Sequence, residues 1–464
     1  MKGVIIIGLM AISSIWLYQR VNDLIKPLPK PELDTNTYWG PDNPTDYEAP
    51  KDVVPFKIAY DQTIIDDLRT QLNRTWRYAP PLEGIKFEYG FNSDALRHIV
   101  DYWRDYYLLK WRAHEEFLNS LPHYKTEIQG LNIHFIHAKP KPEAYKEKKV
   151  VPLLLLHGWP GSVREFYEFI NLLVEVSDIN DYVFEVIAPS LVGYGFSDAA
   201  AKPGFDVAQM AIVMRNLMLR LGYEKFLIQG GDWGSIIGSA ISTLFPENVI
   251  GYHSNMCLLY TPLSMIKSYI ASFMPERFLP QRFFAEHHFP LKDKFKLLLV
   301  ESGYFHLQAT KPDTIGIALQ ASPIALAAYI LEKFQQTTGP GLNQEFNAMD
   351  KVYKLDALLD NIMIYYLTNS ATSAGRFYAE NMSRKFLGLQ LDRVQTPVSM
   401  GCARFKFDLP PALDWALRDK FPNLIHSTYY NQAGHFAALE VPVMLYINFQ
   451  EFAKKAIQID EAKV

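Results

Sequence analysis

The strongest constraint on the fold is an alternation, between residues 150 and 255, of short continuous apolar runs with longer stretches of helical periodicity. The runs are rich in Val, Ile and Leu, and the stretches between them repeat apolar residues every three or four positions. Buried strands that alternate with helices are typical of a parallel sheet covered on both faces. The sequence therefore predicts an α/β fold, with strands at 150–158, 183–189, 225–231 and 249–255 and helices at 163–176 and 207–222.

The sheet is expected to continue on both sides of this region. Residues 124–138 alternate in polarity around Gly130-Leu131, which predicts a β-hairpin. Beyond residue 256 the pattern turns helical and contains no clear strand until two further apolar runs at 396–402 and 424–432. We interpret this as one mostly parallel central sheet, interrupted by a helical lid over the carboxyl edge of its strands.

The rest of the chain is expected to form additions to this core. Residues 26–55 hold seven prolines, which is typical of an extended strap, and residues 61–119 have helical spacing. The predicted segments are an N-terminal membrane anchor (1–20), a strap and helical extension (21–123), the first part of the core (124–255), the lid (256–384) and the second part of the core (385–464).

The anchor is inferred from residues 3–18, an uncharged apolar run of 16 residues. This is slightly shorter than the roughly 20 residues of a full helical span. A cleaved signal peptide is the alternative, but Trp16, Tyr18 and Arg20 are poor neighbours for a cleavage site. Only Lys2 precedes the run, whereas several cations follow it, so the positive-inside tendency favours a body on the cytoplasmic side of the membrane.

Composition excludes several other classes of protein. The 46 basic and 50 acidic residues give a net charge of −4, which argues against a nucleic-acid partner. The two cysteines, Cys257 and Cys402, are too few for a disulfide framework or a zinc ribbon. The aromatic content of 14% is enough to line an apolar pocket as well as a core. Sequons at Asn73 and Asn381 matter only if the chain enters the lumen.

The segment 230–234, Gly-Gly-Asp-Trp-Gly, carries the most informative chemistry. It follows a strand and precedes an apolar helix, and it has the G-x-nucleophile-x-G form of the elbow in α/β-hydrolases. Asp232 stands where serine is usual. An aspartate there can displace a leaving group at saturated carbon and form an ester that water later cleaves. The alternative role for Asp232 is a helix N-cap.

Two backbone amides are candidates for an oxyanion hole. His157-Gly158-Trp159 follows the first core strand, where such folds supply one donor, so the N–H of Trp159 is one candidate. The N–H of Trp233, directly after the nucleophile, is the other. A plain Gly/Pro turn is the alternative interpretation of the first segment.

The base and its orienting acid are expected late in the chain, because these folds place nucleophile, acid and histidine in that order. His435 follows the last strand and is the candidate general base. Asp408 follows the preceding strand and would hold its imidazole. Asp414 and Asp419 are rivals in a helical stretch, and Glu440 is interpreted as a helix-start residue. The remaining histidines show no metal-ligand spacing, and the chemistry requires no cofactor.

The chain resembles the microsomal epoxide hydrolases in five stretches of sequence. They are HGWPGS, GGDWGS, AGHFAALE, WRYAPPLEGIKFEYGFNS and the lid stretch from ESGYFHLQ to AYILEKF. The likeness covers nearly the whole chain and is strongest to the insect branch, the juvenile hormone epoxide hydrolases. It implies that two lid tyrosines, Tyr304 and Tyr378, donate protons to the epoxide oxygen. It also implies a carboxylate at Asp408, where many relatives have Glu.

The resemblance implies hydrolysis of lipophilic epoxides to vicinal diols through an ester on Asp232, at the membrane of the endoplasmic reticulum. Juvenile hormone or related terpenoid epoxides are the expected substrates, and a general detoxifying role is the first alternative. A haloalkane dehalogenase would also use Asp at the elbow but needs halide donors in place of two phenols. A catalytically silent carrier of a lipophilic ligand and a membrane-attached structural protein are the remaining readings. Oligomeric state stays open.

Overall fold

The structure, a computed structural model, describes residues 14, 16, 18–42, 44, 47–48, 50–74, 76–176, 182–279, 288–337, 339 and 349–463. Most of the predicted anchor, residues 1–20, therefore lies outside the described residues. Within the described part, no single helix is both long and apolar enough to cross a bilayer. Two consecutive lid helices, Pro312–Ala321 and Pro323–Thr337, pass that test only as a pair, and they meet at 118°.

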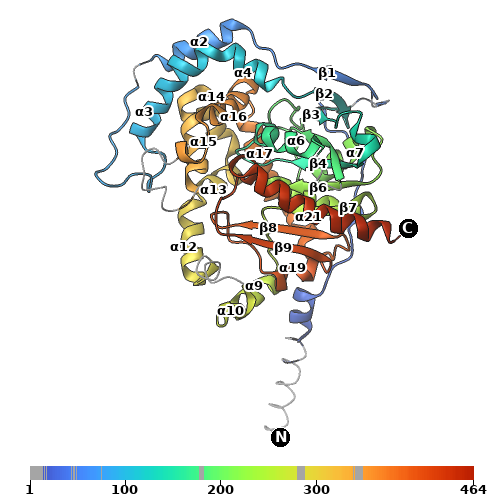
Figure 1. Cartoon of the computed structure of the whole chain (residues 1–464). Coiled ribbons are helices and arrows are strands. Elements are labelled where there is room, and N and C mark those ends of the chain that lie inside the picture. The colour runs from blue at the N-terminus through green and yellow to red at the C-terminus, as the bar shows by residue number, and fades with distance from the viewer. Residues whose placement is uncertain are drawn as a thin grey trace.

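A nine-stranded sheet forms the centre of the molecule (Figure 1), in the order β1-β2-β3-β5-β4-β6-β7-β8-β9. The last six strands in this order are parallel to one another, and β1, β2 and β3 are antiparallel to their neighbours. The α/β prediction is confirmed. The strands are β1 (Val53–Phe56), β2 (His123–Ile128), β3 (Leu131–Ala138), β4 (Lys149–Leu156), β5 (Tyr182–Pro189), β6 (Phe226–Gly230), β7 (Val249–Ser254), β8 (Met400–Phe405) and β9 (Leu424–Tyr430).

Two predictions about strands were wrong in detail. β8 begins four residues later than the apolar run at 396–402, because residues such as Thr396 are buried in the loop that leads to the strand. The strap was expected to contain no packed element, but its end forms β1, which pairs with β2. Most of the described residues of the strap before β1 are in extended backbone. The buried ring of Trp39 packs against Phe205 and attaches this part of the strap to the core.

Helices cover both faces of the sheet. α6 (Tyr167–Val174) and α21 (Pro442–Glu461) pack together over one face, and α7 (Val207–Arg220) and α8 (Asp232–Leu244) pack together over the other. All of β6 and the carboxyl half of β4, Leu153–Leu156, are buried. Their continuous apolar sequence follows from this, because each side chain faces a helical layer whichever way it points.

The described residues of the lid form helices joined by short loops and contain no strand, as predicted. Prolines at first helical positions, for example in α9 and α14, divide it into short segments, because proline is tolerated at the start of a helix but not inside one. The helices from here to residue 389 are α9 (Pro262–Ala271), α10 (Pro275–Phe278), α12 (Leu291–Glu301), α13 (Gly303–Thr310), α14 (Pro312–Ala321), α15 (Pro323–Thr337), α16 (Leu355–Thr368), α17 (Ala371–Asn381) and α18 (Arg384–Leu389).

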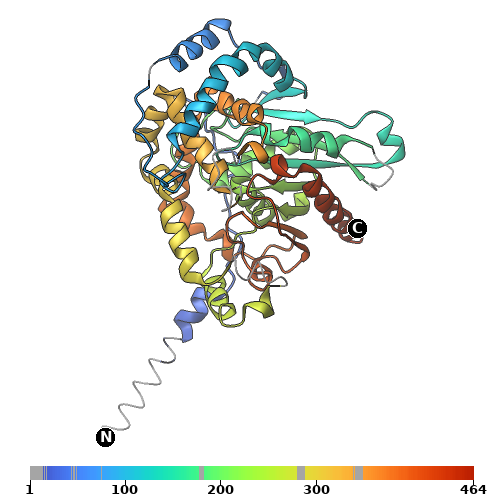
Figure 2. The same cartoon turned by 60° about the vertical axis from the view of Figure 1, so that its left-hand side comes forward.

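The N-terminal extension lies against the outside of the lid (Figure 2). It consists of α2 (Gln62–Leu72), α3 (Ser93–Tyr102), a π-helical turn (Trp103–Tyr107) and α4 (Trp111–Leu118). Buried hydrogen bonds connect it to α16: the hydroxyls of Tyr102 and Tyr107 donate to Asp356 and Asp360 at 2.8 and 2.7 Å. The extension therefore holds the lid from behind.

Cys257, in the loop after β7, and Cys402, within β8, form a disulfide with their Cα atoms 6.1 Å apart. The two sequons differ in accessibility. Asn73 is exposed at the end of α2. Asn381 is 1% exposed, and its side chain accepts from the Val207 amide and donates to the Phe377 carbonyl. Only Asn73 could carry a glycan on the folded chain.

Candidate active site

Asp232 lies at the sharp turn between β6 and α8, where the sequence predicts an elbow. Its φ of +48° is in the left-handed region, which costs free energy for a residue other than glycine. Glycines allow the chain to pack closely around it. A Cβ on Gly234 would lie 2.0 Å from the carbonyl oxygen of Leu156, and one on Gly158 would lie 2.2 Å from Oδ1 of Asp232. The end of β4 and the elbow thus meet without an intervening side chain.

The two oxygens of the Asp232 carboxylate have different surroundings. Oδ1 accepts a hydrogen bond from the backbone N–H of Trp159 at 2.8 Å. Trp233 follows in the first turn of α8, where an N–H has no acceptor within its own helix. Oδ2 lies on the side of His435, 3.4 Å from its Nε2. The geometry fits a carboxylate with one oxygen in an oxyanion hole and the other available to attack.

His435 lies in the loop after β9 and contacts both predicted carboxylates. Its Nδ1 is 2.6 Å from Oδ1 of Asp408, which also accepts from the Leu409 amide. The rival acids are engaged elsewhere. Asp414 accepts from Arg404 at 2.6 Å, and Asp419 accepts from Lys267 at 2.6 Å.

Two opposing effects act on the pKa of His435. Burial lowers it, but the charge of Asp408 and the hydrogen bonds and charges at Asp232 and Asp408 outweigh burial, and the pKa lies well above its usual value. The two carboxylates therefore favour the protonated form of the imidazole.

Tyr304 of α13 and Tyr378 of α17 lie above the elbow, and their ring centroids are 6.1 Å apart. The ring of Tyr304 stacks on that of Trp159 at 4.9 Å, and the ring of Tyr378 meets Trp233 edge-on at 4.9 Å. Burial raises the pKa of both tyrosines, and the charge of Asp232 raises it further. Both hydroxyls therefore keep their protons at neutral pH and can serve as donors.

A small apolar cavity adjoins Trp159 on the lid side. Its walls come from α13 to α17 and include Leu319, Leu326, Tyr329 and Ile330. The structure thus brings the seven predicted site residues, from the core and the lid, to one place beside an apolar surface. Among the described residues there is no cluster of His, Cys, Asp and Glu that could hold a metal ion.

Glu440 was predicted to be a helix-start residue, and it lies in the first turn of the short helix α20 (Ala437–Glu440). Its carboxylate also bends back to accept from the amides of Gly434 at 2.8 Å and Phe436 at 3.0 Å. These amides flank His435, so Glu440 holds the backbone of the histidine loop. The sequence shows an acid five residues after the histidine, but not that the chain folds back to it.

Glu165 is a second, half-buried acid near the site that the sequence did not indicate. Burial raises the pKa of its carboxyl to about 8; the charge of His435 opposes this shift, and Asp232, Glu440 and Asp408 add to it. It follows the oxyanion segment by only a few residues, in the turn Val163–Phe166, but nothing in its local sequence distinguishes it from a surface glutamate.

Comparison with known proteins agrees with this geometry. The family described as "Epoxide hydrolase N terminus" matches residues 53–166, and the family described as "alpha/beta hydrolase fold" matches residues 151–440. The chain is 49% identical to juvenile hormone epoxide hydrolase 1 of Ctenocephalides felis, over 91% of this chain and 89% of that protein. It is 39% identical to epoxide hydrolase 1 of Sus scrofa, over 89% and 91%.

Solved structures give the same result. The crystal structure of juvenile hormone epoxide hydrolase from the silkworm Bombyx mori superposes with a TM-score of 0.88 at 41% identity, covering 92% of this chain and all of that one. An epoxide hydrolase from Aspergillus niger superposes with a TM-score of 0.71 at 29% identity, covering 87% and 97%.

Proposed function

Because this chain belongs to the microsomal epoxide hydrolase family, in the branch of the insect juvenile hormone epoxide hydrolases, we propose that it hydrolyses juvenile hormone and related terpenoid epoxides. The observation that carries this proposal is the split environment of the Asp232 carboxylate, with Oδ1 on the Trp159 amide and Oδ2 near His435 and below the lid tyrosines. A serine elbow or a halide site would not need this arrangement.

In the first half of the proposed reaction, Oδ2 of Asp232 attacks an epoxide carbon and the C–O bond of the ring breaks. The departing oxygen takes a proton from Tyr304 or Tyr378, so that no free alkoxide forms. The product is a hydroxyalkyl ester of Asp232 whose carbonyl oxygen, Oδ1, remains on the Trp159 amide. Ring strain activates the leaving group.

In the second half, His435 takes a proton from water, and the resulting hydroxide attacks the Asp232 ester carbonyl. Negative charge gathers on Oδ1, where the amides of Trp159 and Trp233 stabilise it. Asp408 orients the imidazole and stabilises its cation. Collapse of the intermediate releases the diol and regenerates the carboxylate and the phenol, with His435 returning the proton.

The apolar cavity and the aromatic lid support a lipophilic substrate. A general detoxifying role is the second candidate, supported by the 39% identity to the pig enzyme. The test is diol formation from a panel that contains a terpenoid epoxy ester, an aryl epoxide and a small alkyl epoxide. A preference of about 100-fold in kcat/KM for the terpenoid ester, roughly 2.7 kcal/mol, supports the hormone-directed proposal. A flat ranking supports detoxification.

A matched variant distinguishes an enzyme from a catalytically silent carrier in the same test. Asp232→Asn keeps the shape of the elbow but removes the nucleophile, so turnover must disappear while ligand binding remains. If wild type binds the terpenoid ester and forms no diol, the chain is a carrier and the enzymatic proposal fails.

We also propose that the chain is anchored in the membrane of the endoplasmic reticulum by residues 1–20, with its body in the cytoplasm. The cations that follow the anchor, Arg20, Lys26 and Lys30, support this side. The disulfide between Cys257 and Cys402 favours the opposite orientation, with the body in the oxidising lumen of the endoplasmic reticulum. Asn73 decides between them, because it is the exposed sequon: a glycan present in wild type and absent in Asn73→Gln overturns the cytoplasmic orientation.

A further inference from the structure

The helix α9 presents an apolar face to the outside of the molecule. Met265 and Tyr269 of α9, and Phe273 in the turn directly after it, follow one another at intervals of four residues and are 59%, 60% and 69% exposed. A parallel row of exposed apolar residues lies next to them: Ile266, Ile270 and Met274. A surface helix of a globular protein normally turns such a face toward the core.

The single charge in α9 lies on another side of the helix. Lys267 donates to Asp419 at 2.6 Å and to the carbonyl of Trp415 at 3.0 Å, both in α19 (Asp414–Lys420). The outward face is therefore uncharged, and the polar contacts of α9 are made inward, to the protein.

The lid helix α12 also carries exposed apolar side chains. Phe295, Leu298, Leu299 and Val300 are all exposed, and Leu299 is 81% exposed. A small separate core joins the two helices to α19; it consists of Ala271, Leu279, Phe289, Leu413 and Ala416, with Leu291 packed against it. The two apolar faces thus belong to one packed unit.

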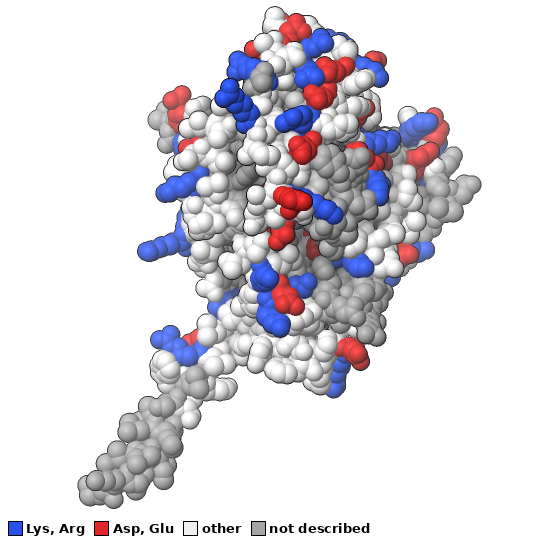
Figure 3. All heavy atoms as spheres, turned by 90° about the vertical axis from the view of Figure 1, so that its left-hand side faces the viewer, with Lys and Arg blue, Asp and Glu red and all other residues white. Residues whose placement is uncertain are grey.

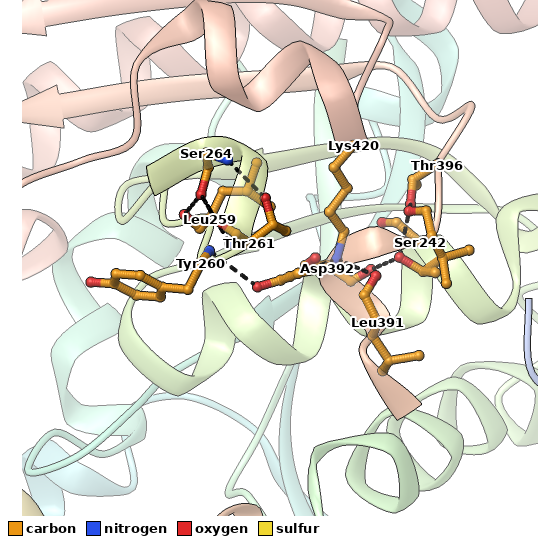
Figure 4. A network of polar contacts seen from close by, with 12 residues as sticks. Ser242, Leu259, Tyr260, Thr261, Ser264, Leu391, Asp392, Thr396 and Lys420 are labelled. Carbon is orange, nitrogen blue, oxygen red and sulfur yellow. Dashed lines mark hydrogen bonds and ion pairs between the residues drawn. The ribbon is translucent and has the colours of Figure 1, made fainter. Parts of the chain in front are cut away.

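The start of α9 is fixed to the core by a polar network (Figure 4). Thr261 and Ser264 form a reciprocal capping box, and the hydroxyl of Ser264 also donates to the Leu259 carbonyl. The amide of Tyr260 donates to Asp392, which also accepts from the buried Lys420 at 2.9 Å. The outward direction of the apolar face is consequently determined by the fold.

The N-terminal segment is fixed at the same place. Arg393, the neighbour of Asp392, donates to the carbonyls of Asp23 and Lys26, and the amide of Leu28 donates to the Arg393 carbonyl at 2.9 Å. Figures 1 and 2 both show α9, α10 and the N-terminal helix at one end of the molecule. The apolar run 3–18 is therefore joined to the body beside the apolar faces of α9 and α12.

The surroundings of these faces favour lipid over a second copy of the chain. Aromatic residues with polar tips lie beside them, among them Tyr260 and Trp415, which are 64% and 38% exposed. Such side chains are enriched at membrane interfaces. The exposed Lys292 and Lys296 on α12 suit phosphate headgroups. Figure 3 shows a largely uncharged surface beside the N-terminal segment, interrupted by a few charged side chains at the base of that segment, and a denser gathering of charged side chains at the opposite end.

We propose that the outward faces of α9 and α12 lie in the interfacial region of a lipid bilayer, so that the lid itself rests on the membrane in addition to any contact made by residues 1–20. The lid then faces the phase in which a lipophilic epoxide is concentrated.

The test uses the full chain with a single added cysteine, Phe273→Cys or Leu299→Cys, carrying an environment-sensitive fluorophore. The two native cysteines are bonded to each other, so the added thiol takes the label. Val443→Cys is the matched control, since Val443 is 55% exposed and belongs to α21, a helix that covers the central sheet and is not part of the lid. The probe is a phosphatidylcholine vesicle that contains a lipid with a shallow nitroxide quencher. Unchanged turnover of a water-soluble epoxide shows that each variant is folded.

The expected result is at least about 3-fold stronger quenching at positions 273 and 299 than at 443. Equal quenching at all three positions overturns the proposal, because the N-terminal segment alone would then be the contact. Shielding of the labels that grows with protein concentration without vesicles also overturns it, in favour of self-association. This readout does not depend on which epoxide is the substrate.

Discussion

Nε2 of His435 lies 3.4 Å from Oδ2 of Asp232, the oxygen that the Trp159 amide leaves free. While Asp232 is ionised, its charge helps to hold a proton on His435. Alkylation replaces that carboxylate by a neutral ester, which removes one of the two charges that raise the pKa of the imidazole. The arrangement thus favours the free base more strongly once the intermediate that needs one has formed.

The two half-reactions should therefore respond differently to pH. Ester formation does not require a neutral imidazole, and its rate should be nearly constant between about pH 6 and pH 8. Ester hydrolysis should slow as the pH falls through the lowered pKa that His435 has in the ester. Single-turnover fluorescence of Trp159 and Trp233, which flank Asp232, can follow both steps. Parallel loss of both rates in acid would contradict the coupling.

Replacement of His435 by Gln should separate the steps completely. Ester formation continues, but hydrolysis should lose about 10²- to 10⁴-fold in rate because no base remains to activate water. Intact mass spectrometry should show the chain heavier by one substrate molecule, with the added mass on a peptide containing Asp232. An unmodified chain after incubation with substrate would rule out the two-step scheme.

The acid that orients His435 can be tested with a matched pair. Asp408→Asn keeps the size of the side chain but removes the charge opposite Nδ1, so ester hydrolysis should fall by about 10²-fold or more. Asp414→Asn should leave this rate within about 2-fold, since Asp414 is bonded to Arg404 and not to His435. Asp408→Glu keeps the charge on a longer side chain, and activity between that of wild type and that of Asp408→Asn is expected. If Asp414→Asn slows ester hydrolysis more than Asp408→Asn does, Asp414 and not Asp408 is the acid that orients His435.

The lid tyrosines should control only the first half-reaction. Tyr304→Phe and Tyr378→Phe each keep the ring that packs on Trp159 or Trp233 but remove one donor to the epoxide oxygen. Each should slow ester formation by about 10- to 10²-fold, and the double variant by more than either, with ester hydrolysis unchanged. Tyr329→Phe is a control on the same side of Trp159. If it slows ester formation equally, the roles of Tyr304 and Tyr378 are wrong.

The order of elements could be predicted because local patterns determine it. Continuous apolar strands such as β4 occur only where both faces of a sheet are covered, and the glycines around Asp232 reflect close backbone contact that larger residues would block. The order of Asp232, Asp408 and His435 along the chain then restricts the site to one edge of the sheet.

Long-range contacts could not be predicted in this way. β1 consists of four residues within a proline-rich strap, and it is a strand only because β2 offers a free edge. The disulfide between Cys257 and Cys402 depends on the pairing of β7 with β8, which brings together two cysteines 145 residues apart in sequence. The outward face of α9 has the same periodicity as an inward one, so its direction follows only from where Thr261 and Lys267 are fixed.

Glu440 gives the last prediction, because its carboxylate bonds to the amides on both sides of His435. In Glu440→Gln only one side-chain oxygen can accept, and the amide nitrogen cannot, so one buried N–H loses its partner. The histidine loop should loosen and the imidazole should spend less time aligned with Asp408. Ester hydrolysis should then slow by about 10-fold while ester formation stays within about 2-fold.

Glu165→Gln is the matched control for this variant. With a pKa of about 8, the Glu165 carboxyl is mostly neutral at pH 7, so the amide replaces a group of similar charge. A merely structural role for Glu440 would lower the unfolding temperature and both half-reaction rates together. A selective loss of the hydrolytic step, with the pH dependence of that step also displaced, instead identifies Glu440 as the residue that positions the base.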